Sequence, residues 1–358
     1  MKFKASRKGI DFAAGEIGNG KEKETDMINK TAYIESTGVN PHKNLAIEEY
    51  LFSRCEADEI ILYLWQNQNT IVIGKNQNAW KECQISRIEE DGGVIARRIS
   101  GGGAVFHDLG NLNFTFLVSK ENYDLKRQLG VILKAVQRLG IHAEASGRND
   151  ILVDGQKFSG NAFHEHKGRC YHHGTIMVNV KLGELNKYLN VSKKKLESKG
   201  IKSVRSRVAN LIDYNPGLTI EQLKKALRET FEEAYGHESR IIREEELDRQ
   251  AVQELYEKYA SWDWVYGREF EFQYEVSERF CWGQVDIQFQ VDSGLITDAE
   301  VYSDSLKPEV IQELPKVLKG IRYNNQRIGE KIGELHSDDV QKEEMFRDVE
   351  SWLRKTEL

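Results

Sequence analysis

Residues 97–108, RRISGGGAVFHD, constrain the fold more than any other stretch of this 358-residue chain. An apolar run precedes the two arginines and another follows the three glycines, which predicts a strand, a tight loop and a second strand. Three residues without side chains let the backbone approach a ligand closely, and their N–H groups can converge on an anion. Arginine adds planar charge that suits phosphate or carboxylate. A triple glycine alone is more often a turn or a linker, but this combination favours an anion-binding loop.

The composition is that of a soluble globular protein. With 39% hydrophobic residues and a formal net charge of −6, the chain has no basic excess that would indicate nucleic-acid binding. No apolar run approaches the roughly 18 residues that a transmembrane helix needs. The four cysteines lack the CxxC spacing of a zinc site and suggest no disulfide framework. We therefore expect a cytoplasmic protein without membrane contact.

Hydrophobic periodicity predicts an α+β fold for the first half of the chain. Helices are expected over 44–57 and 125–139. The runs 60–65 and 70–74 are expected to form one hairpin, and Asp154-Gly155 should be the turn of another. The expected strands cover 60–65, 70–74, 94–98, 103–107, 113–118, 150–153, 156–162 and 171–180. They predict a mixed, mostly antiparallel sheet with packed helices.

The remaining chain predicts a second, smaller α+β domain. Helices are expected over 220–235 and, after the charged run 240–249, up to residue 259. The small domain should contain strands 270–274, 284–291 and 295–302 and helices 308–318 and 338–353. Residues 1–26 are charged and lack periodicity, which predicts a disordered extension. The expected division is therefore an extension over 1–26, a catalytic domain over 27–259 and an accessory domain over 260–358.

Residues 97–108 resemble the RRxSGGGAVFHD signature of the lipoate-protein ligase A family. Further motifs of that family follow in the same order: NLAIEE at 44–49, LWQN at 64–67, IGKNQN at 73–78, GRND at 147–150, KFSGNA at 157–162, HHGT at 172–175, KKL at 194–196, SVRSRV at 203–208 and WDW at 262–264. The resemblance implies the fold shared by biotin and lipoate ligases, which is similar to class II synthetases, with the family's C-terminal domain.

The resemblance also implies a two-step reaction. Lipoate and Mg·ATP would give lipoyl-AMP and pyrophosphate, and the lipoyl group would then pass to a lysine of an acceptor domain. The implied acceptors are the lipoyl domains of 2-oxoacid dehydrogenase E2 subunits and the glycine cleavage H protein. Nucleic acid and membranes are not expected partners, and a monomer is the expected state.

Lys157 is the candidate catalytic residue. It lies on the second arm of the predicted hairpin, where a lysine would ordinarily point into solvent, but the family's active-site lysine falls at this position. Its implied role is to bridge the acyl carboxylate and the α-phosphate. Asn149 and Asp150 open the same hairpin and suit either a turn or a ligand role, in which Asn149 contacts the nucleotide and Asp150 holds Mg²⁺. His107 is either structural or a nucleotide contact.

The remaining candidates surround the glycine loop and the predicted strands. His172 and His173 should point to opposite faces of a strand and so cannot easily chelate one ion, which leaves His173 as a residue that lines the acyl or the adenylate pocket. Candidate nucleotide contacts are Arg98, Gly102, Gly103, Ala104, Val105, Phe106, His107, Asn149, Asp150, Lys157, His173, Gly174 and Thr175. Candidate lipoate contacts are Trp65, Val72, Arg98, Ser100, Gly101 and Lys157, although the apolar ones also suit an ordinary core.

Several alternatives remain open. The closest is a transferase that uses preformed acyl-adenylate or an acyl-carrier thioester, and Cys170 could serve such an enzyme as an acyl nucleophile. A biotin ligase would share the fold but would carry a GRGRxGR-like loop, which is absent. A non-catalytic lipoate-binding protein would be expected to lack Lys157 or Asp150. The basic segment 192–207 is either a solvated helix and loop or a flap over the adenylate that also suits an acidic acceptor.

Overall fold

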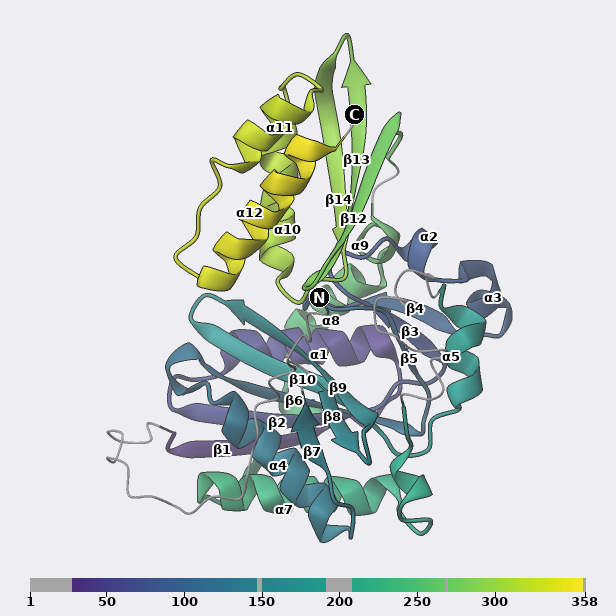
Figure 1. The fold of residues 1–358 in the computed structure, drawn as a ribbon. Coiled ribbons are helices and arrows are strands. Elements are labelled where there is room, and N and C mark those ends of the chain that lie inside the picture. Colours follow the sequence, from purple (N-terminus) through teal and green to yellow (C-terminus); the bar gives the residue numbers. More distant parts are fainter. Residues whose placement is uncertain (1–27, 147–149, 191–207, 268–269, 357–358) are drawn as a thin grey trace, which may run out of the picture.

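The fold consists of a large unit and a smaller one above it (Figure 1). The computed structural model describes residues 28–146, 150–190, 208–267 and 270–356. The predicted disordered extension, the candidate residue Asn149 and the basic segment 192–207 lie outside the described residues. None of the helices in the described ranges is long and apolar enough to cross a membrane.

The large unit is built on an eight-stranded sheet. Its strand order is β11 (Arg240–Ile241), β1 (Lys30–Glu35), β2 (Glu59–Trp65), β6 (Asn111–Ser119), β10 (Arg169–Met177), β9 (Gln156–His166), β8 (Asp150–Val153) and β7 (Glu144–Ser146). The pairs β11–β1 and β1–β2 are parallel, and the pairs from β2 to β7 are antiparallel. This arrangement confirms the predicted mixed, mostly antiparallel sheet.

The two faces of this sheet have different roles, because successive strand residues point to opposite sides. On one face Phe114 and Phe116 belong to a core completed by α4 (Leu125–Arg138) and α7 (Ile220–Tyr235). The other face packs against α1 (Pro41–Arg54) and α8 (Arg249–Ala260), which follows η4 (Glu244–Glu246). Short 3-10 turns η1 (Lys120–Asn122) and η3 (Leu211–Asp213) complete the connections.

A second sheet of three strands carries the glycine loop. Its central strand β3 (Thr70–Ile73) pairs in parallel with β4 (Val94–Arg97) and antiparallel with β5 (Val105–His107). The helices α2 (Ala79–Glu82), α3 (Ile85–Glu90) and α5 (Leu182–Tyr188) lie beside it. The predicted hairpin of 60–65 with 70–74 is therefore wrong, because β2 and β3 belong to different sheets. The buried amide of Asn67 accepts a hydrogen bond from Asn44 and fixes the chain where it leaves the large sheet.

The small unit confirms the predicted C-terminal α+β architecture. Its antiparallel strands are β12 (Tyr274–Phe280), β13 (Gly283–Asp292) and β14 (Leu295–Ser303), and its helices are α10 (Pro308–Leu318), α11 (Asn325–Ile332) and α12 (Val340–Lys355). The strand expected over 270–274 instead begins at Tyr274. Helix α9 (Trp262–Tyr266) packs on the large unit, where Val265 is part of a buried cluster.

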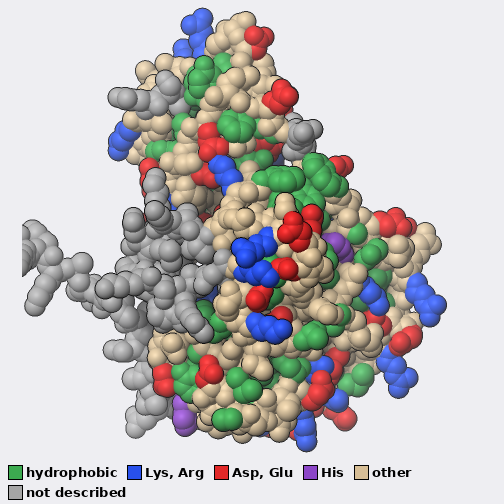
Figure 2. All heavy atoms as spheres, turned by 90° about the vertical axis from the view of Figure 1, so that its right-hand side faces the viewer, with side chains coloured by type: hydrophobic (Ala, Val, Ile, Leu, Met, Phe, Trp, Pro, Cys, Tyr) green, Lys and Arg blue, Asp and Glu red, His purple; other side chains and the backbone are tan. Residues whose placement is uncertain are grey.

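The small unit touches the glycine loop directly. The Gly102 N–H donates a hydrogen bond of 2.9 Å to the Ser305 carbonyl, and the Ser303 N–H donates one of 2.8 Å to the Asn76 carbonyl. Exposed hydrophobic side chains gather at this neck between the units (Figure 2), where Trp80 and Trp262 both lie against the Tyr266 ring. The junction therefore combines backbone bonds at the loop with an aromatic surface beside it.

Candidate active site

Strand pairing brings five separate sequence segments into two rows on one face of the large sheet. The first row runs from Asp150 through Gly160, Thr175 and Asn113 to Trp65. The second row contains Ala162, His173, Thr115 and Tyr63. Four of these nine residues, namely Trp65, Asp150, His173 and Thr175, are candidates from the sequence. The register of the sheet thus brings distant candidates onto a common surface.

Lys157 lies over this surface. Its Nζ is 2.7 Å from Asp150 Oδ1, and both side chains are about one third exposed. Gly160 makes room for it, since a Cβ at residue 160 would stand 2.7 Å from Lys157 Nζ and 3.9 Å from Thr175 Oγ1. The lysine is therefore held within the candidate site by a carboxylate, and it does not extend into solvent as an ordinary strand lysine would.

Arg98 shapes the glycine loop from inside. Its Nε donates to Ser100 Oγ at 3.0 Å, while Nη2 donates to the Gly101 and Gly103 carbonyls at 2.8 and 2.9 Å. Burial lowers its pKa to about 10, so the guanidinium is still charged near neutral pH. These contacts place the predicted residues Arg98, Ser100, Gly101 and Gly103 in one hydrogen-bonded group, and a direct ligand contact of Arg98 stays a prediction.

Arg97 has a structural position outside the site. Its guanidinium donates to the carbonyls of Gly74, Gln77 and Val265, at 3.1, 2.6 and 2.7 Å. It thereby ties the strand of the glycine loop to α9. Trp264 completes this connection, because its indole N–H donates to the Arg97 carbonyl at 2.8 Å.

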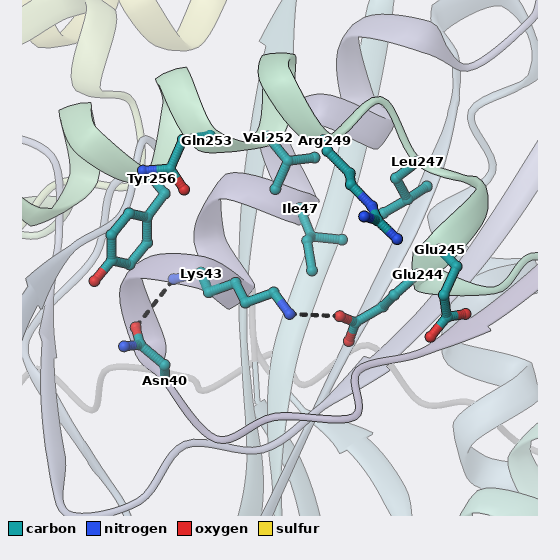
Figure 3. Close-up of a pocket in the computed structure, with 10 residues that line it drawn as sticks. All are labelled: Asn40, Lys43, Ile47, Glu244, Glu245, Leu247, Arg249, Val252, Gln253 and Tyr256. Carbon is teal, nitrogen blue, oxygen red and sulfur yellow. Dashed lines mark hydrogen bonds and ion pairs between the residues drawn. The ribbon is translucent and has the colours of Figure 1, made fainter.

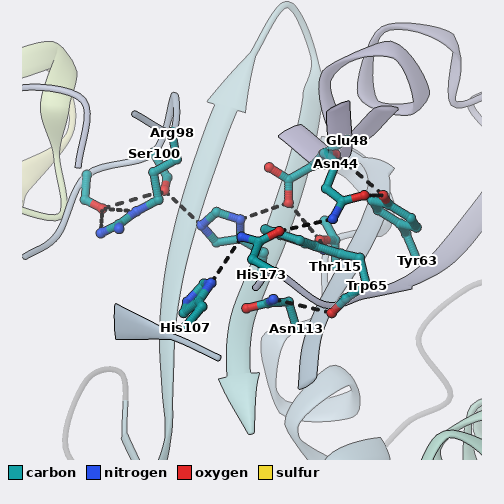
Figure 4. Close-up of polar contacts among 12 residues, drawn as sticks. Asn44, Glu48, Tyr63, Trp65, Arg98, Ser100, His107, Asn113, Thr115 and His173 are labelled. Carbon is teal, nitrogen blue, oxygen red and sulfur yellow. Dashed lines mark hydrogen bonds and ion pairs between the residues drawn. The ribbon is translucent and has the colours of Figure 1, made fainter. Parts of the chain in front are cut away.

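Glu48 is a site residue that sequence reasoning missed. It is 1% exposed and accepts hydrogen bonds from His173 Nδ1 at 2.8 Å and from Thr115 Oγ1 at 2.6 Å (Figure 4). His173 Nε2 in turn lies 2.8 Å from Ser100 Oγ. A sequence signal existed, because Glu48 shares a helix face with Leu45 and Phe52, and an acid on an apolar face is unusual unless it has a buried partner.

His107 presents an unpaired donor. Asn44 holds the amide oxygen of Asn67, so the Asn67 amide nitrogen faces His107 Nδ1 at 3.2 Å and donates to it. The proton of the neutral ring is then on Nε2, which is buried and has no partner in the described part of the chain. Burial lowers the pKa of His107 to about 3. An uncharged buried N–H suits an acceptor on a ligand, and the nucleotide contact of His107 stays a prediction.

His172 lies on the opposite face, which confirms the prediction for the histidine pair. Its ring nitrogens are 3.1 Å from Gln128 Oε1 and 2.8 Å from Asn161 Oδ1, and burial lowers its pKa to about 3. Cys170 shares this face, and burial raises its pKa to about 11. A thiol that is both protonated and turned away from His173 is poorly placed to act as an acyl nucleophile.

The remaining candidates are divided between the site surface and the core. Trp65 is buried on the site face and donates to Thr115 Oγ1 at 3.1 Å, and Val72 is buried in β3. Phe106 packs on Tyr188 away from the large sheet, with ring centroids 5.4 Å apart. Gly174 belongs to the other face, where a Cβ would stand 2.7 Å from Phe114. Ala104 and Val105 are partly buried beside the loop.

A surface pocket elsewhere contains none of the predicted site residues. It has a volume of about 500 Å³ and lies between the start of α1 and the start of α8 (Figure 3). Its polar rim includes Lys43, which forms a 2.7 Å ion pair with Glu244. The described residues also include no group of three or more His, Cys, Asp or Glu side chains that could hold a metal ion.

Family models match both units of the chain. Residues 40–232 match the "Lipoyl protein ligase A/B catalytic domain", and residues 269–353 match the "Bacterial lipoate protein ligase C-terminus". Fold and site thus define a lipoyl ligase catalytic domain joined to the C-terminal domain of bacterial lipoate ligases. A "Lipoate-protein ligase A" of Bdellovibrio bacteriovorus is 40% identical over 338 residues, covering 92% of this chain and 99% of that protein. The chain therefore belongs to the lipoate-protein ligase A family and is an ATP-dependent ligase.

Solved structures agree with this assignment. P. falciparum LipL1 in complex with lipoate is 33% identical, with a TM-score of 0.79 over 91% of this chain and all of its own. A lipoate-protein ligase A bound with ATP is 26% identical, with a TM-score of 0.59 over 67% of this chain and 99% of its own. A bipartite ligase from Thermoplasma acidophilum, described with its E2 lipoyl domain, is 28% identical, with a TM-score of 0.60 over 68% of this chain and 98% of its own.

Proposed function

We propose that Lys157 and Asp150 form the centre at which lipoate is activated and then transferred to the lysine of a lipoyl domain. The observation that carries this proposal is the 2.7 Å contact between Lys157 Nζ and Asp150 Oδ1 on the same sheet face as His173 and Thr175. The lipoate carboxylate and the α-phosphate are both negative, so activation depends mainly on positioning and charge neutralisation. A lysine held over Gly160 supplies that charge between them.

The same geometry suits both half-reactions. The carboxylate oxygen attacks the α-phosphorus and pyrophosphate leaves, after which the acceptor amine attacks the acyl carbon and AMP leaves. Lys157 stabilises the negative charge on the phosphate in each step. Asp150 offers one carboxylate, which fits Mg²⁺ because that ion usually keeps several waters and binds the substrate phosphates through the rest of its shell. When bound, Mg²⁺ supplies further neutralising charge.

The acceptor domains are inferred from the relatives. The Thermoplasma enzyme is described with its E2 lipoyl domain, and we propose that E2 lipoyl domains and the glycine cleavage H protein accept the lipoyl group here.

We also propose that the enzyme acts as a monomer, which light scattering of the full chain would test. We further propose that the two domains divide close to Gly267 and not at the predicted residue 260, because Val265 of α9 packs in a cluster of the large unit.

The test is pyrophosphate release from Mg·ATP with lipoate, octanoate or biotin, combined with mass analysis of an added lipoyl domain. Lys157→Ala should reduce lipoate-dependent pyrophosphate release at least a hundredfold, because it removes the positive charge that is held between the lipoate carboxylate and the α-phosphate. Lys134→Ala, an exposed lysine on α4, is the matched control. Modification of the acceptor only from supplied lipoyl-adenylate would indicate a transferase and would overturn the assignment of Lys157 to activation.

A further inference from the structure

A continuous chain of buried side chains connects the large sheet to the glycine loop. Trp65, Thr115, Glu48, His173, Ser100 and Arg98 follow one another with donor–acceptor distances of 3.1, 2.6, 2.8, 2.8 and 3.0 Å. All six residues are at most 7% exposed. Figure 4 shows that Glu48 reaches in from α1 while Ser100 and Arg98 come from the loop side. Buried polar groups arranged in this way act as one network. Removing one of them leaves its neighbour buried without a hydrogen-bond partner, which destabilises the folded protein.

The chemistry of the residues fixes the direction of each bond. The Trp65 indole can only donate, so Thr115 Oγ1 accepts from it and gives its own proton to Glu48. The carboxylate of Glu48 can only accept, so His173 Nδ1 must carry the proton between them. In the neutral ring Nε2 is then an acceptor, and the Ser100 hydroxyl donates to it.

This direction leaves the Ser100 oxygen free to accept from Arg98. The Arg98 Nε–H donates to Ser100 Oγ, and the rest of the guanidinium holds the Gly101, Gly103 and Val72 carbonyls. A serine hydroxyl has one proton and two acceptor positions, so when its proton is used on His173 both acceptor positions stay available and Arg98 takes one of them. The tautomer that Glu48 imposes therefore joins His173 to the same Ser100 side chain that Arg98 holds.

We propose that Glu48 and His173 are positioning residues for ATP binding, acting through Ser100 and Arg98 to hold the glycine loop in its phosphate-binding shape. This inference rests on the proposed function, since it assigns the loop to ATP. The effect on lipoate is predicted to be small, although His173 lies on the same sheet face as Lys157. The proposal is therefore an alternative to the direct lipoate contact that the family resemblance implies for Ser100 and Arg98. His173 therefore has two alternative roles: its side chain lines the lipoate pocket, or it supports the glycine loop through Ser100.

The test compares two substitutions of His173 with Ser100→Ala. An Asn side chain places its amide near the position of Nδ1 and can still reach Glu48, whereas Gln places its amide near Nε2 and can still reach Ser100. We expect Ser100→Ala and His173→Asn each to raise the KM for ATP about tenfold. This is the loss of affinity that is typical when a hydrogen bond to a charged group is removed. The KM for lipoate should change less than twofold, and His173→Gln should raise the KM for ATP less than His173→Asn.

The double variant Ser100→Ala/His173→Asn decides between the two roles. If His173 acts through Ser100, the double variant should have the same KM for ATP as Ser100→Ala, because the second change removes a link already broken. Multiplying effects, or a KM for lipoate that rises more than the KM for ATP, would overturn the proposal. Ser159→Ala is the matched control, since this serine is fully buried on the opposite face and its hydroxyl has no partner among the described residues. Absence of lipoate-dependent pyrophosphate release in the unmodified enzyme would instead refute the proposed function.

Discussion

Lys157 takes its position because residue 160 has no side chain. We predict that Gly160→Ala reduces the rate of lipoate-dependent pyrophosphate release at least tenfold, because the new Cβ would stand 2.7 Å from Nζ and 2.8 Å from Cε of Lys157. The displaced atoms are the end of a flexible side chain, so the melting temperature should change little. Gly130→Ala is the control, since no atom lies within 4 Å of its Cβ position in α4 and alanine favours helix by about 1 kcal/mol. Full activity of Gly160→Ala would contradict the positioning.

The buried histidines predict how stability depends on pH. Burial lowers the pKa of His107 and of His172 from 6.5 to about 3. Between those pH values the unfolded chain binds protons that the folded chain does not, so the free energy of unfolding should fall as the pH falls. The expected slope, well below pH 6.5, is about 1.4 kcal/mol per pH unit for each histidine. Urea unfolding at pH 7, 6 and 5 measures it.

A matched pair of variants isolates this effect from the titration of carboxylates. The stability difference between wild type and His172→Gln should shrink as the pH is lowered, because the variant has no buried imidazole to keep neutral. His336→Gln is the control, since the His336 side chain is 75% exposed. A difference that is constant from pH 7 to pH 5 would show that His172 is not held neutral.

At the residue scale, the sequence analysis named Lys157, Asp150 and His173 as candidates but gave no role to Glu48 or Asn67, although both lie within the quoted motifs. The motifs mark residues whose chemistry is recognisable in isolation. Glu48 and Asn67 gain their importance from burial and from partners 125 and 40 residues away. Those partners become known only when the register of the sheets is known.

The β8–β9 hairpin shows an element that local sequence specifies. Its turn residues Asp154 and Gly155 have φ values of 49° and 74°, as the predicted two-residue turn requires. Gly155→Ala should lower the free energy of unfolding by about 1 kcal/mol, because alanine is strained at positive φ. Chemical denaturation checks this value. Gly183→Ala, with neither a positive φ nor a neighbour within 4 Å, should cost less; an equal cost would contradict the backbone argument.

Pairing between strands was less predictable than the strands themselves. Short β-branched runs identified β2 and β3, but such a run does not say which strand lies beside which. The hairpin prediction failed because β2 pairs with β1 and β6, while β3 pairs with β4 and β5. The two-residue strand β11 was also missed, because its pairing partner β1 is about 200 residues earlier in the chain.

For the whole molecule, the contact between the two units depends on small loop residues. A Cβ at residue 101 would stand 2.2 Å from the Ser305 carbonyl oxygen and 3.0 Å from the Leu306 backbone. Gly101→Ala should therefore loosen the docking of the small unit and increase the radius of gyration measured by X-ray scattering. Gly38→Ala, whose Cβ position is open, should leave it unchanged. An unchanged radius in Gly101→Ala would mean that the backbone absorbs the clash locally.

The hydrogen bond from Gly102 to Ser305 has a consequence for ATP affinity. If the loop N–H groups bind phosphate, the Ser305 carbonyl is a tethered competitor for one of them, present at the high effective concentration that covalent linkage gives. The measured affinity for ATP is then lower by the free energy needed to displace that carbonyl. Because the two binding events are thermodynamically linked, ATP must weaken the docking of the small unit on the loop by the same factor. A change that damages only the docking surface of the small unit should consequently make the enzyme bind ATP more tightly.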